Sequence, residues 1–172
     1  IVPTVTYGTN GGTYSIPVGS TTYTISSKIT GTDEGGSGLS KVEYAWSSSN
    51  TEEPSQWTTV ANGTTVEKNA TGGTYYLWVK TTDGAGNVTI TKSSAFEVGY
   101  TIEYNSNGGT GTVSSQRKVH GTNITLNNGS TLGRTGYTFI GWAETANATE
   151  IKYGKNASYT ENKSIKLYAV WQ

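Results

Sequence analysis

Large apolar side chains alternate with polar ones along most of the chain, and helical spacing is absent. Residues 41–47 are the clearest case, because every second side chain there is large and apolar, ending at Trp46. Residues 22–29 and 74–81 repeat the alternation. Successive side chains of a strand point to opposite faces of its sheet, so these segments are predicted to be half-buried strands.

Clusters of Gly, Asn, Asp and Thr separate these runs and indicate turns. They occupy residues 9–12, 35–38, 61–63 and 83–87. The glycines of 83–87 provide the positive φ that a tight connection between two strands needs. About seven short strands with regular turns over the first ~100 residues are typical of a β-sandwich.

Composition agrees with an all-β, or mostly β, fold. The 172 residues include 31 Thr, a β-branched residue that suits a pleated surface. Charged residues make up only 14 %, below the usual quarter or so. With 12 Tyr, 5 Trp and 2 Phe, the chain has too many aromatic side chains for a disordered polar tract.

The charge and residue inventory excludes several classes of function. Residues 1–98 hold five Lys and eight acidic residues, and residues 99–172 hold seven basic and four acidic ones. The basic excess of the second half is scattered, which argues against nucleic acid as a partner. No apolar run approaches the ~18 residues of a membrane span, so we expect no membrane insertion. The chain has no Cys, hence no thiol chemistry or disulfide, and no Met or signal peptide, so we expect a piece of a larger protein.

The first half resembles the bacterial immunoglobulin-like modules of surface proteins. The resemblance is carried by Asp33 with Ser37-Gly38-Leu39, by Val42-Glu43-Tyr44 and by GTYYLWVKTTDGAGN at 73–87. It implies an Ig-like β-sandwich over residues 1–98, with Trp46 in the core position of the third strand and Tyr75 or Tyr76 in a tyrosine corner. Leu77 and Val79 are expected in the same core.

The second half resembles the Listeria–Bacteroides repeat, also called the internalin-type B repeat. The matching motifs are YTIEYNSNGG (100–109), RTGYTFIGW (134–142), KYGKNASY (152–159) and IKLYAVW (165–171). The resemblance implies a small β-grasp-like domain over 99–172, found in surface proteins of Gram-positive bacteria as a spacer or interaction module without catalytic activity. One departure is His120, where the family more often has an aromatic residue.

The rings of residues 134–142 form either a binding platform or a core. On a strand, Tyr137 and Phe139 would share a face, and Gly141 would introduce a bulge that returns Trp142 to the interior. Burying one such ring stabilises by roughly 1.5–3 kcal/mol, and a domain of this size has only about 5 kcal/mol in total. We therefore expect most of the rings inside. The predicted core of the second half also includes Ile102, Tyr104, Leu126, Leu167 and Trp171.

Stacking on a glycan or on a nucleic-acid base is the alternative for the tyrosines of this half. The candidates are Tyr137, Tyr153 and Tyr159.

A cation site is a second possibility, at the turns of the sandwich. Oxygen ligands suited to a hard cation come from Asp33, Glu34, Asp83 and Asn87, although their spacing matches no Ca²⁺ loop. The alternative is that Asp83 and Asn87 bond to the backbone of their own turn. We expect no cofactor.

Catalysis has little support in the sequence. His120 is the only histidine, and Glu52 and Glu53 are adjacent residues of a predicted loop tip. We therefore expect no enzyme. A Lys–Asn isopeptide bond is a further possibility in surface domains, and it needs a buried Lys whose charge is suppressed.

These observations predict two β domains joined by a short link. The expected function is a non-catalytic module of a bacterial cell-surface protein, extracellular or secreted. It would act as a stalk or spacer and as an adhesion or protein-interaction domain. The partners would be a host or bacterial surface protein, a glycan, or neighbouring domains of the same chain. The alternative is a carbohydrate-binding accessory module of a secreted enzyme.

Overall fold

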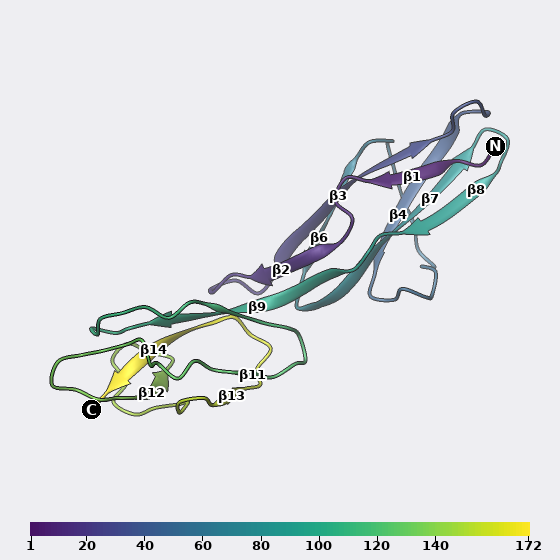
Figure 1. Ribbon diagram of the computed structural model, residues 1–172. Coiled ribbons are helices and arrows are strands. Elements are labelled where there is room, and N and C mark those ends of the chain that lie inside the picture. The colour runs from purple at the N-terminus through teal and green to yellow at the C-terminus, as the bar shows by residue number, and fades with distance from the viewer. The chain divides into compact units, whose positions relative to one another are not determined.

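A computed structural model describes residues 1–172, and it consists of strands joined by turns and loops, with no helix (Figure 1). The predicted all-β fold is confirmed. No helix capable of crossing a membrane is found. The chain forms two compact units. The first contains Ile1–Tyr14 and Thr24–Glu97, and the second contains Ser15–Tyr23 and Val98–Gln172.

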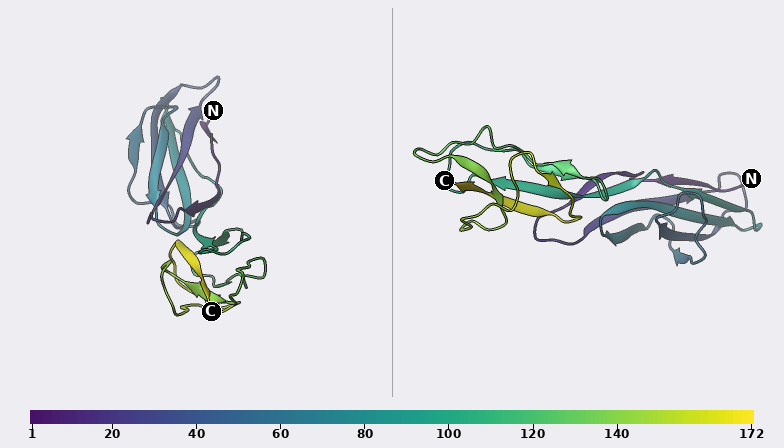
Figure 2. Two further views of the ribbon diagram at one scale, coloured as in Figure 1. Left: turned by 90° about the vertical axis from the view of Figure 1, so that its left-hand side faces the viewer. Right: turned by 90° about the horizontal axis from the view of Figure 1, so that it is seen from below.

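The first unit is a sandwich of two sheets, visible as two layers of strands (Figure 2). One sheet has the order β1-β3-β6, and the other contains β8-β7-β4-β5. The strands are β1 (Thr4–Tyr7), β3 (Tyr23–Thr32), β4 (Leu39–Ser47), β5 (Thr58–Val60), β6 (Thr65–Ala70), β7 (Gly73–Asp83) and β8 (Val88–Lys92). Two further strands, β2 (Gly12–Ile16) and β9 (Phe96–Asn105), begin in this unit and continue into residues of the second.

Alternating side chains of the two sheets fill the core of the sandwich. On β3, Ile25 and Ile29 are buried, and on β7, Leu77 and Val79 are fully buried, as predicted for the last two. The sheets approach closely at Gly31, where an added Cβ would lie 3.0 Å from the side chains of Leu39 and Thr81. Glycine is needed there because a larger residue would push the sheets apart.

Two aromatic side chains assigned from the resemblance lie at the edge of this core. Trp46 is half-buried, and its ring meets Phe96 edge-on, with ring centres 5.1 Å apart. The Tyr75 hydroxyl donates a hydrogen bond to the Thr71 carbonyl oxygen at 3.0 Å. A tyrosine near the start of a strand that bonds back to the backbone a few residues upstream has the geometry of a tyrosine corner.

The second unit is built on one sheet of four strands in the order β10-β9-β14-β12, with β11 and β13 paired separately. Its strands after β9 are β10 (Gln116–Lys118), β11 (Ile124–Thr125), β12 (Phe139–Ala143), β13 (Ser158–Tyr159) and β14 (Ile165–Trp171). β9 and β14 run parallel, whereas β10 and β12 pair antiparallel to their neighbours. Parallel strands require a long crossover connection, and here loops with short strands provide it.

The rings of 134–142 largely turn inward. Phe139 and Trp142 are buried, and their centres lie 4.9 Å apart in an edge contact. Trp142 also donates from its indole nitrogen to the Asn127 carbonyl oxygen at 2.7 Å, which satisfies its one polar atom. The core cluster consists of Ile102, Leu126, Phe139, Trp142, Tyr159, Ile165, Leu167 and Ala169, with Tyr104 and Trp171 half-buried against it.

Gly141 forms the predicted bulge. The pairing of β12 with β14 shifts register between Phe139 and Gly141, and Gly141 has a φ of +154°. A side chain at this position would meet the Tyr153 carbonyl oxygen at 2.6 Å. The bulge places Phe139 and Trp142 on the same buried side although they are three positions apart, a spacing that puts residues of a regular strand on opposite faces.

Candidate binding surface

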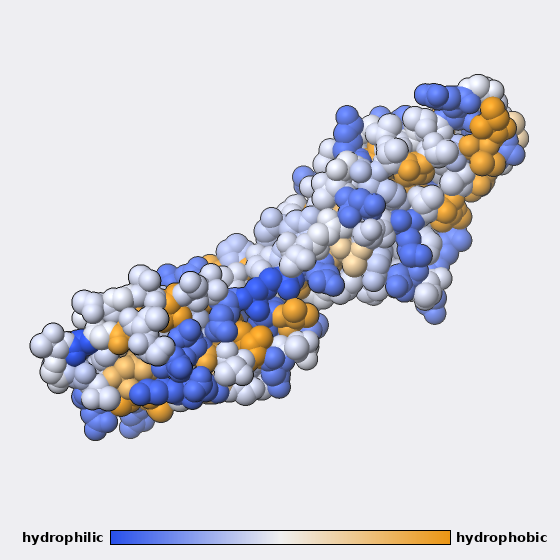
Figure 3. All heavy atoms as spheres, in the orientation of Figure 1, coloured by the Kyte–Doolittle hydropathy of each residue, from blue (hydrophilic) through white to orange (hydrophobic).

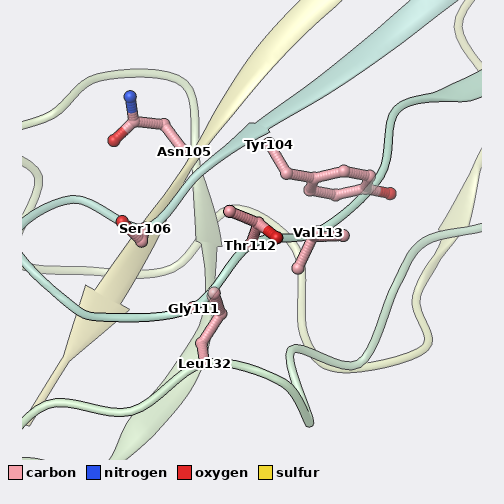
Figure 4. Close-up of a pocket in the computed structure, with 7 residues that line it drawn as sticks. All are labelled: Tyr104, Asn105, Ser106, Gly111, Thr112, Val113 and Leu132. Carbon is pink, nitrogen blue, oxygen red and sulfur yellow. The ribbon is translucent and has the colours of Figure 1, made fainter.

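Two neighbouring depressions lie on the second unit, and Leu132 lines both. The first, called the Tyr104 pocket, has a volume of about 230 Å³ and is lined by Tyr104, Asn105, Ser106, Gly111, Thr112, Val113 and Leu132 (Figure 4). The second, called the polar hollow, has a volume of about 410 Å³ and is lined by Asn128, Gly129, Ser130, Leu132, Thr138, Phe139, Lys155 and Asn156.

The polar groups of the Tyr104 pocket are largely committed to the protein itself. The Tyr104 hydroxyl donates to the Gln116 side-chain oxygen and accepts from the Asn127 backbone N–H at 3.0 Å. Burial raises the pKa of Tyr104. The Ser106 carbonyl oxygen accepts from the Trp171 indole, and the Asn105 side chain accepts from the Asn107 backbone N–H. This depression is therefore a structural crease with little hydrogen-bonding capacity for a ligand.

The polar hollow is held open by two tight turns. In the first, the Asn127 and Asn128 side chains accept hydrogen bonds from the backbone N–H groups of Gly129 and Ser130, at 2.8 Å and 3.0 Å. Such Asx turns arise where an Asn side chain bonds to its own backbone two residues on. Gly129 has a φ of +70°, and a Cβ there would overlap the Phe139 ring at 2.3 Å. The turn therefore lies directly on that ring.

The second turn places Lys155 and Asn156 at the hollow. It is closed by a hydrogen bond from the Ala157 N–H to the Gly154 carbonyl oxygen at 3.2 Å. Asn156 has a φ of +58°, in the left-handed region. The Lys155 ammonium lies 5.5 Å from the centre of the Phe139 ring, within the range of a cation–π contact.

The three candidate tyrosines have different fates. Tyr137 is 52 % exposed, and the Arg134 guanidinium covers its ring at 4.1 Å. Tyr153 is half-buried and donates to the Glu161 carboxylate at 3.1 Å; burial first, and then that carboxylate, raise its pKa. Tyr159 is fully buried, so its ring has no face for a sugar. Of the three, only Tyr137 presents a largely exposed side chain.

Two of the cation candidates, Asp33 and Asp83, accept hydrogen bonds from the turns in which they lie. Asp83 accepts from the Ala85 and Asn87 backbone N–H groups and from the Asn87 side chain, all within 2.9 Å. The hydrogen bond from the Asn87 side chain is the main cause that lowers the pKa of Asp83. Asp33 accepts from the Gly38 N–H at 2.8 Å, and Glu34 is exposed. These are the bonds of turn stabilisation, and no group of three or more His, Asp or Glu side chains is placed to hold a metal ion.

His120 takes part in a local structural pair. Its Nδ1 lies 2.7 Å from the Tyr100 hydroxyl, and the two rings are 5.9 Å apart. The aromatic contact that the family resemblance implies at this position is thus replaced by an imidazole–phenol contact. Glu52 and Glu53 are exposed in the loop between β4 and β5.

One charged residue of the interior has no signal in the sequence pattern. Lys118 is fully buried, and its ammonium donates to the Asn162 side-chain oxygen at 2.9 Å and to the Val119 carbonyl oxygen at 3.4 Å. Burial lowers the pKa of Lys118. None of these acceptors is a carboxylate, whereas a Lys–Asn isopeptide bond would need an acid beside it. The burial of Lys118 cannot be predicted from the sequence, because its strand has only three residues and shows no clear alternation of apolar and polar side chains.

Apolar side chains are exposed near the N-terminus of the first unit. Figure 3 shows an orange area where Figure 1 marks the N-terminus. The side chains of Ile1 and Val2 are more than half exposed. Val88, at the start of the edge strand β8, is 50 % exposed. The Thr89 hydroxyl donates to the Pro3 carbonyl oxygen at 2.7 Å, so the first residues lie beside that strand.

Comparison with known protein families finds a match in the second half of the chain. Residues 100–170 match the family model of the Listeria-Bacteroides repeat domain, which confirms the resemblance predicted there. The match covers less than half of the chain, and no family model supports the immunoglobulin-like resemblance of the first half. No curated protein matches the chain. The repeat is typical of extracellular or surface proteins of bacteria.

Proposed function

We propose that this chain is a non-catalytic module of a bacterial cell-surface protein, in which it acts as a spacer and as an adhesion domain. The observation that carries the proposal is the match of residues 100–170 to a repeat found in bacterial surface proteins. The rest of the molecule is compatible with that role. Charged residues make up only 14 % of the chain, and Asp83 is engaged in the hydrogen bonds of its own turn.

The surface location is tested by labelling. Antibodies raised against residues 1–172 are applied to intact and to permeabilised cells of the organism that encodes the chain. We expect labelling of intact cells, and its loss when the cells are first treated with an external protease. Labelling that appears only after permeabilisation would contradict the proposal.

Adhesion is tested separately. Beads coated with the chain are applied to host-derived and bacterial surfaces, and beads coated with an unrelated β-sandwich serve as the control. Retention above the control supports an adhesion role. Equal retention on every surface leaves the spacer role alone, which the labelling experiment addresses.

The alternative is an accessory module that binds carbohydrate for a secreted enzyme. The polar hollow is the feature that favours this reading, because polar side chains line it together with the half-buried Leu132. The two readings differ in the parent protein: further repeats support the spacer, and a hydrolase domain in the same chain supports the accessory module.

A further inference from the structure

The rim of the polar hollow carries hydrogen-bonding groups that the protein does not use. The side-chain amide nitrogen of Asn128, the side chain of Asn156 and the Lys155 ammonium have no hydrogen-bond partner in the protein, and the same is true of the Ser130 and Thr138 hydroxyls. In the Tyr104 pocket next to it, the Tyr104 hydroxyl and the side-chain oxygen of Asn105 are engaged in hydrogen bonds within the protein. The hollow thus combines free donors and acceptors with the half-buried Leu132 and the ring of Phe139.

Asn156 lines the hollow from a left-handed turn position, a conformation that asparagine tolerates. Two residues other than glycine have a positive φ, Asn107 at 48° and Asn156 at 58°. Asn107 is explained by its side chain, which donates to the Ala146 and Ala169 carbonyl oxygens. Asn156 makes no such bond, although glycine would take this conformation at lower cost. Asn156 lines the hollow.

The charge at the hollow is also unbalanced. Lys152 and Lys166 of the same unit form ion pairs with glutamates, but Lys155 has none and contacts only the Phe139 ring. The Lys155 ammonium, the side-chain amides of Asn128 and Asn156 and the apolar Leu132 line one hollow. Together they suit a ligand that has a carboxylate, several hydroxyls and an apolar face. A sugar acid has all three.

We propose that the polar hollow binds a carboxylated sugar residue at the end of a glycan. Lys155 pairs with its carboxylate, the amides of Asn128 and Asn156 bind its hydroxyls, and its C–H face rests on the half-buried Leu132. This site deepens the proposed adhesion function and rests on it, since a surface protein is exposed to such glycans. Acidic sugars occur both as sialic acids and as uronic acids, so the experiment includes both.

The test is a titration of the ¹⁵N-labelled whole chain, followed by NMR. The probes are 3′-sialyllactose and trigalacturonic acid, with lactose and maltotriose as their neutral counterparts. We expect concentration-dependent shifts of the backbone and side-chain amides around Asn128 and Asn156 with at least one acidic probe. The neutral probes should cause at least fivefold weaker effects. The acidic probe that binds identifies which source of ligand the hollow fits.

Three variants assign the effect to the hollow. Lys155→Met should weaken binding of the acidic probe at least fivefold. Asn156→Gly should weaken it as well while the turn persists, because glycine accepts the φ of +58°. Lys163→Met is the control, since Lys163 is also an exposed lysine of this unit but does not line the hollow.

Several results would overturn the inference. They are the absence of shifts with both acidic probes, shifts confined to other surfaces, or unchanged binding in both Lys155→Met and Asn156→Gly. Any of these would leave the labelling experiment untouched, so the failure of the hollow as a site and the failure of the surface location can be told apart.

Discussion

Replacing a glycine of the second unit by alanine can have two separate costs. One is strain of the left-handed backbone, and the other is overlap of the new Cβ with neighbouring atoms. Gly129 and Gly121 have similar φ values, +70° and +74°. A Cβ at Gly129 would overlap the Phe139 ring, whereas one at Gly121 would have nothing within 4 Å. The pair therefore distinguishes the two costs at matched backbone geometry.

We expect Gly129→Ala to destabilise the second unit by about 2–5 kcal/mol, because strain of about 1–2 kcal/mol adds to overpacking of about 1–3 kcal/mol. Gly121→Ala should lose only about 1–2 kcal/mol from the left-handed backbone. Urea unfolding followed by tryptophan fluorescence measures both. Equal losses would mean that the Phe139 ring moves aside without cost.

The Tyr7 hydroxyl gives the first unit a pH dependence on the alkaline side. Burial raises the pKa of Tyr7 to about 12, and its hydrogen bond with Thr91, at 2.8 Å, acts in the opposite direction. In the unfolded chain, tyrosine ionises near pH 10. The unfolded state therefore loses this proton first, and stability falls as the pH rises from 10 through 12.

Tyr7→Phe should make the loss of stability between pH 10 and 12 shallower than in the original chain. The measurement is the urea midpoint at several pH values, compared with Tyr44→Phe, at a half-buried tyrosine of the same unit. Parallel pH profiles for the original chain and Tyr7→Phe would show that Tyr7 ionises as freely in the folded state as in the unfolded one.

At the scale of elements, the turn between β7 and β8 is organised by a single carboxylate. Asp83 accepts three hydrogen bonds from the turn that follows it, and its pKa lies below its usual range. A carboxyl group with a lowered pKa in the folded state stabilises above its unfolded pKa. Its contribution is lost as the pH falls through the lower folded value.

Asp83→Ala should lower the thermal unfolding midpoint of the first unit at pH 7. Below pH 4, the variant should lose less stability than the original chain as the pH falls. Circular dichroism at a series of temperatures and pH values measures this. Glu34→Ala, at another turn, is the control, because Glu34 is exposed. If both variants behave alike, the turn bonds of Asp83 contribute nothing beyond those of a solvated residue.

Elements with strong local signals were predictable from the sequence. Alternation placed the strands β4 and β7, and the glycine at 141 indicated the bulge that returns Trp142 to the core. The turn role of Asp83 and Asn87 follows from residue type. The hollow was not predictable, since its two turns lie more than twenty residues apart, and only folding brings Asn128 and Asn156 together.

The alternation of apolar and polar residues also does not predict which individual tyrosines are buried. Tyr137, Tyr153 and Tyr159 have similar polar surroundings in the sequence, yet Tyr137 is half exposed and Tyr159 fully buried. The difference depends on pairing of β13 with β11, a long-range contact that local spacing does not encode. The parallel pairing of β9 with β14 is hidden for the same reason.

At the scale of the whole molecule, the second unit is discontinuous in sequence. Ser15–Tyr23 belongs to it, although 74 residues of the first unit's chain separate that segment from Val98. Ser164 connects the pieces: its hydroxyl donates to the Ile16 carbonyl oxygen at 2.6 Å and accepts from the Thr101 N–H at 3.0 Å. Ser164 is buried, with 7 % exposure.

Ser164→Ala should destabilise the second unit by about 1–3 kcal/mol, since two buried backbone groups lose their partner. Hydrogen exchange at the Thr101 amide should accelerate along with the loss of stability. Ser158→Ala, at an exposed position of the same unit, should change neither quantity. Unchanged exchange at Thr101 in Ser164→Ala would mean that another acceptor replaces the hydroxyl.

The discontinuity of the second unit bears on how its gene can be rearranged. A crossover between the codons of Glu97 and Val98 would transfer the matched repeat to a new protein but leave Ser15–Tyr23 behind. The transplanted repeat would then need another segment to replace the partner of Ser164. Transfer of the complete second unit therefore requires both halves of the coding sequence, even though only the second half carries the repeat.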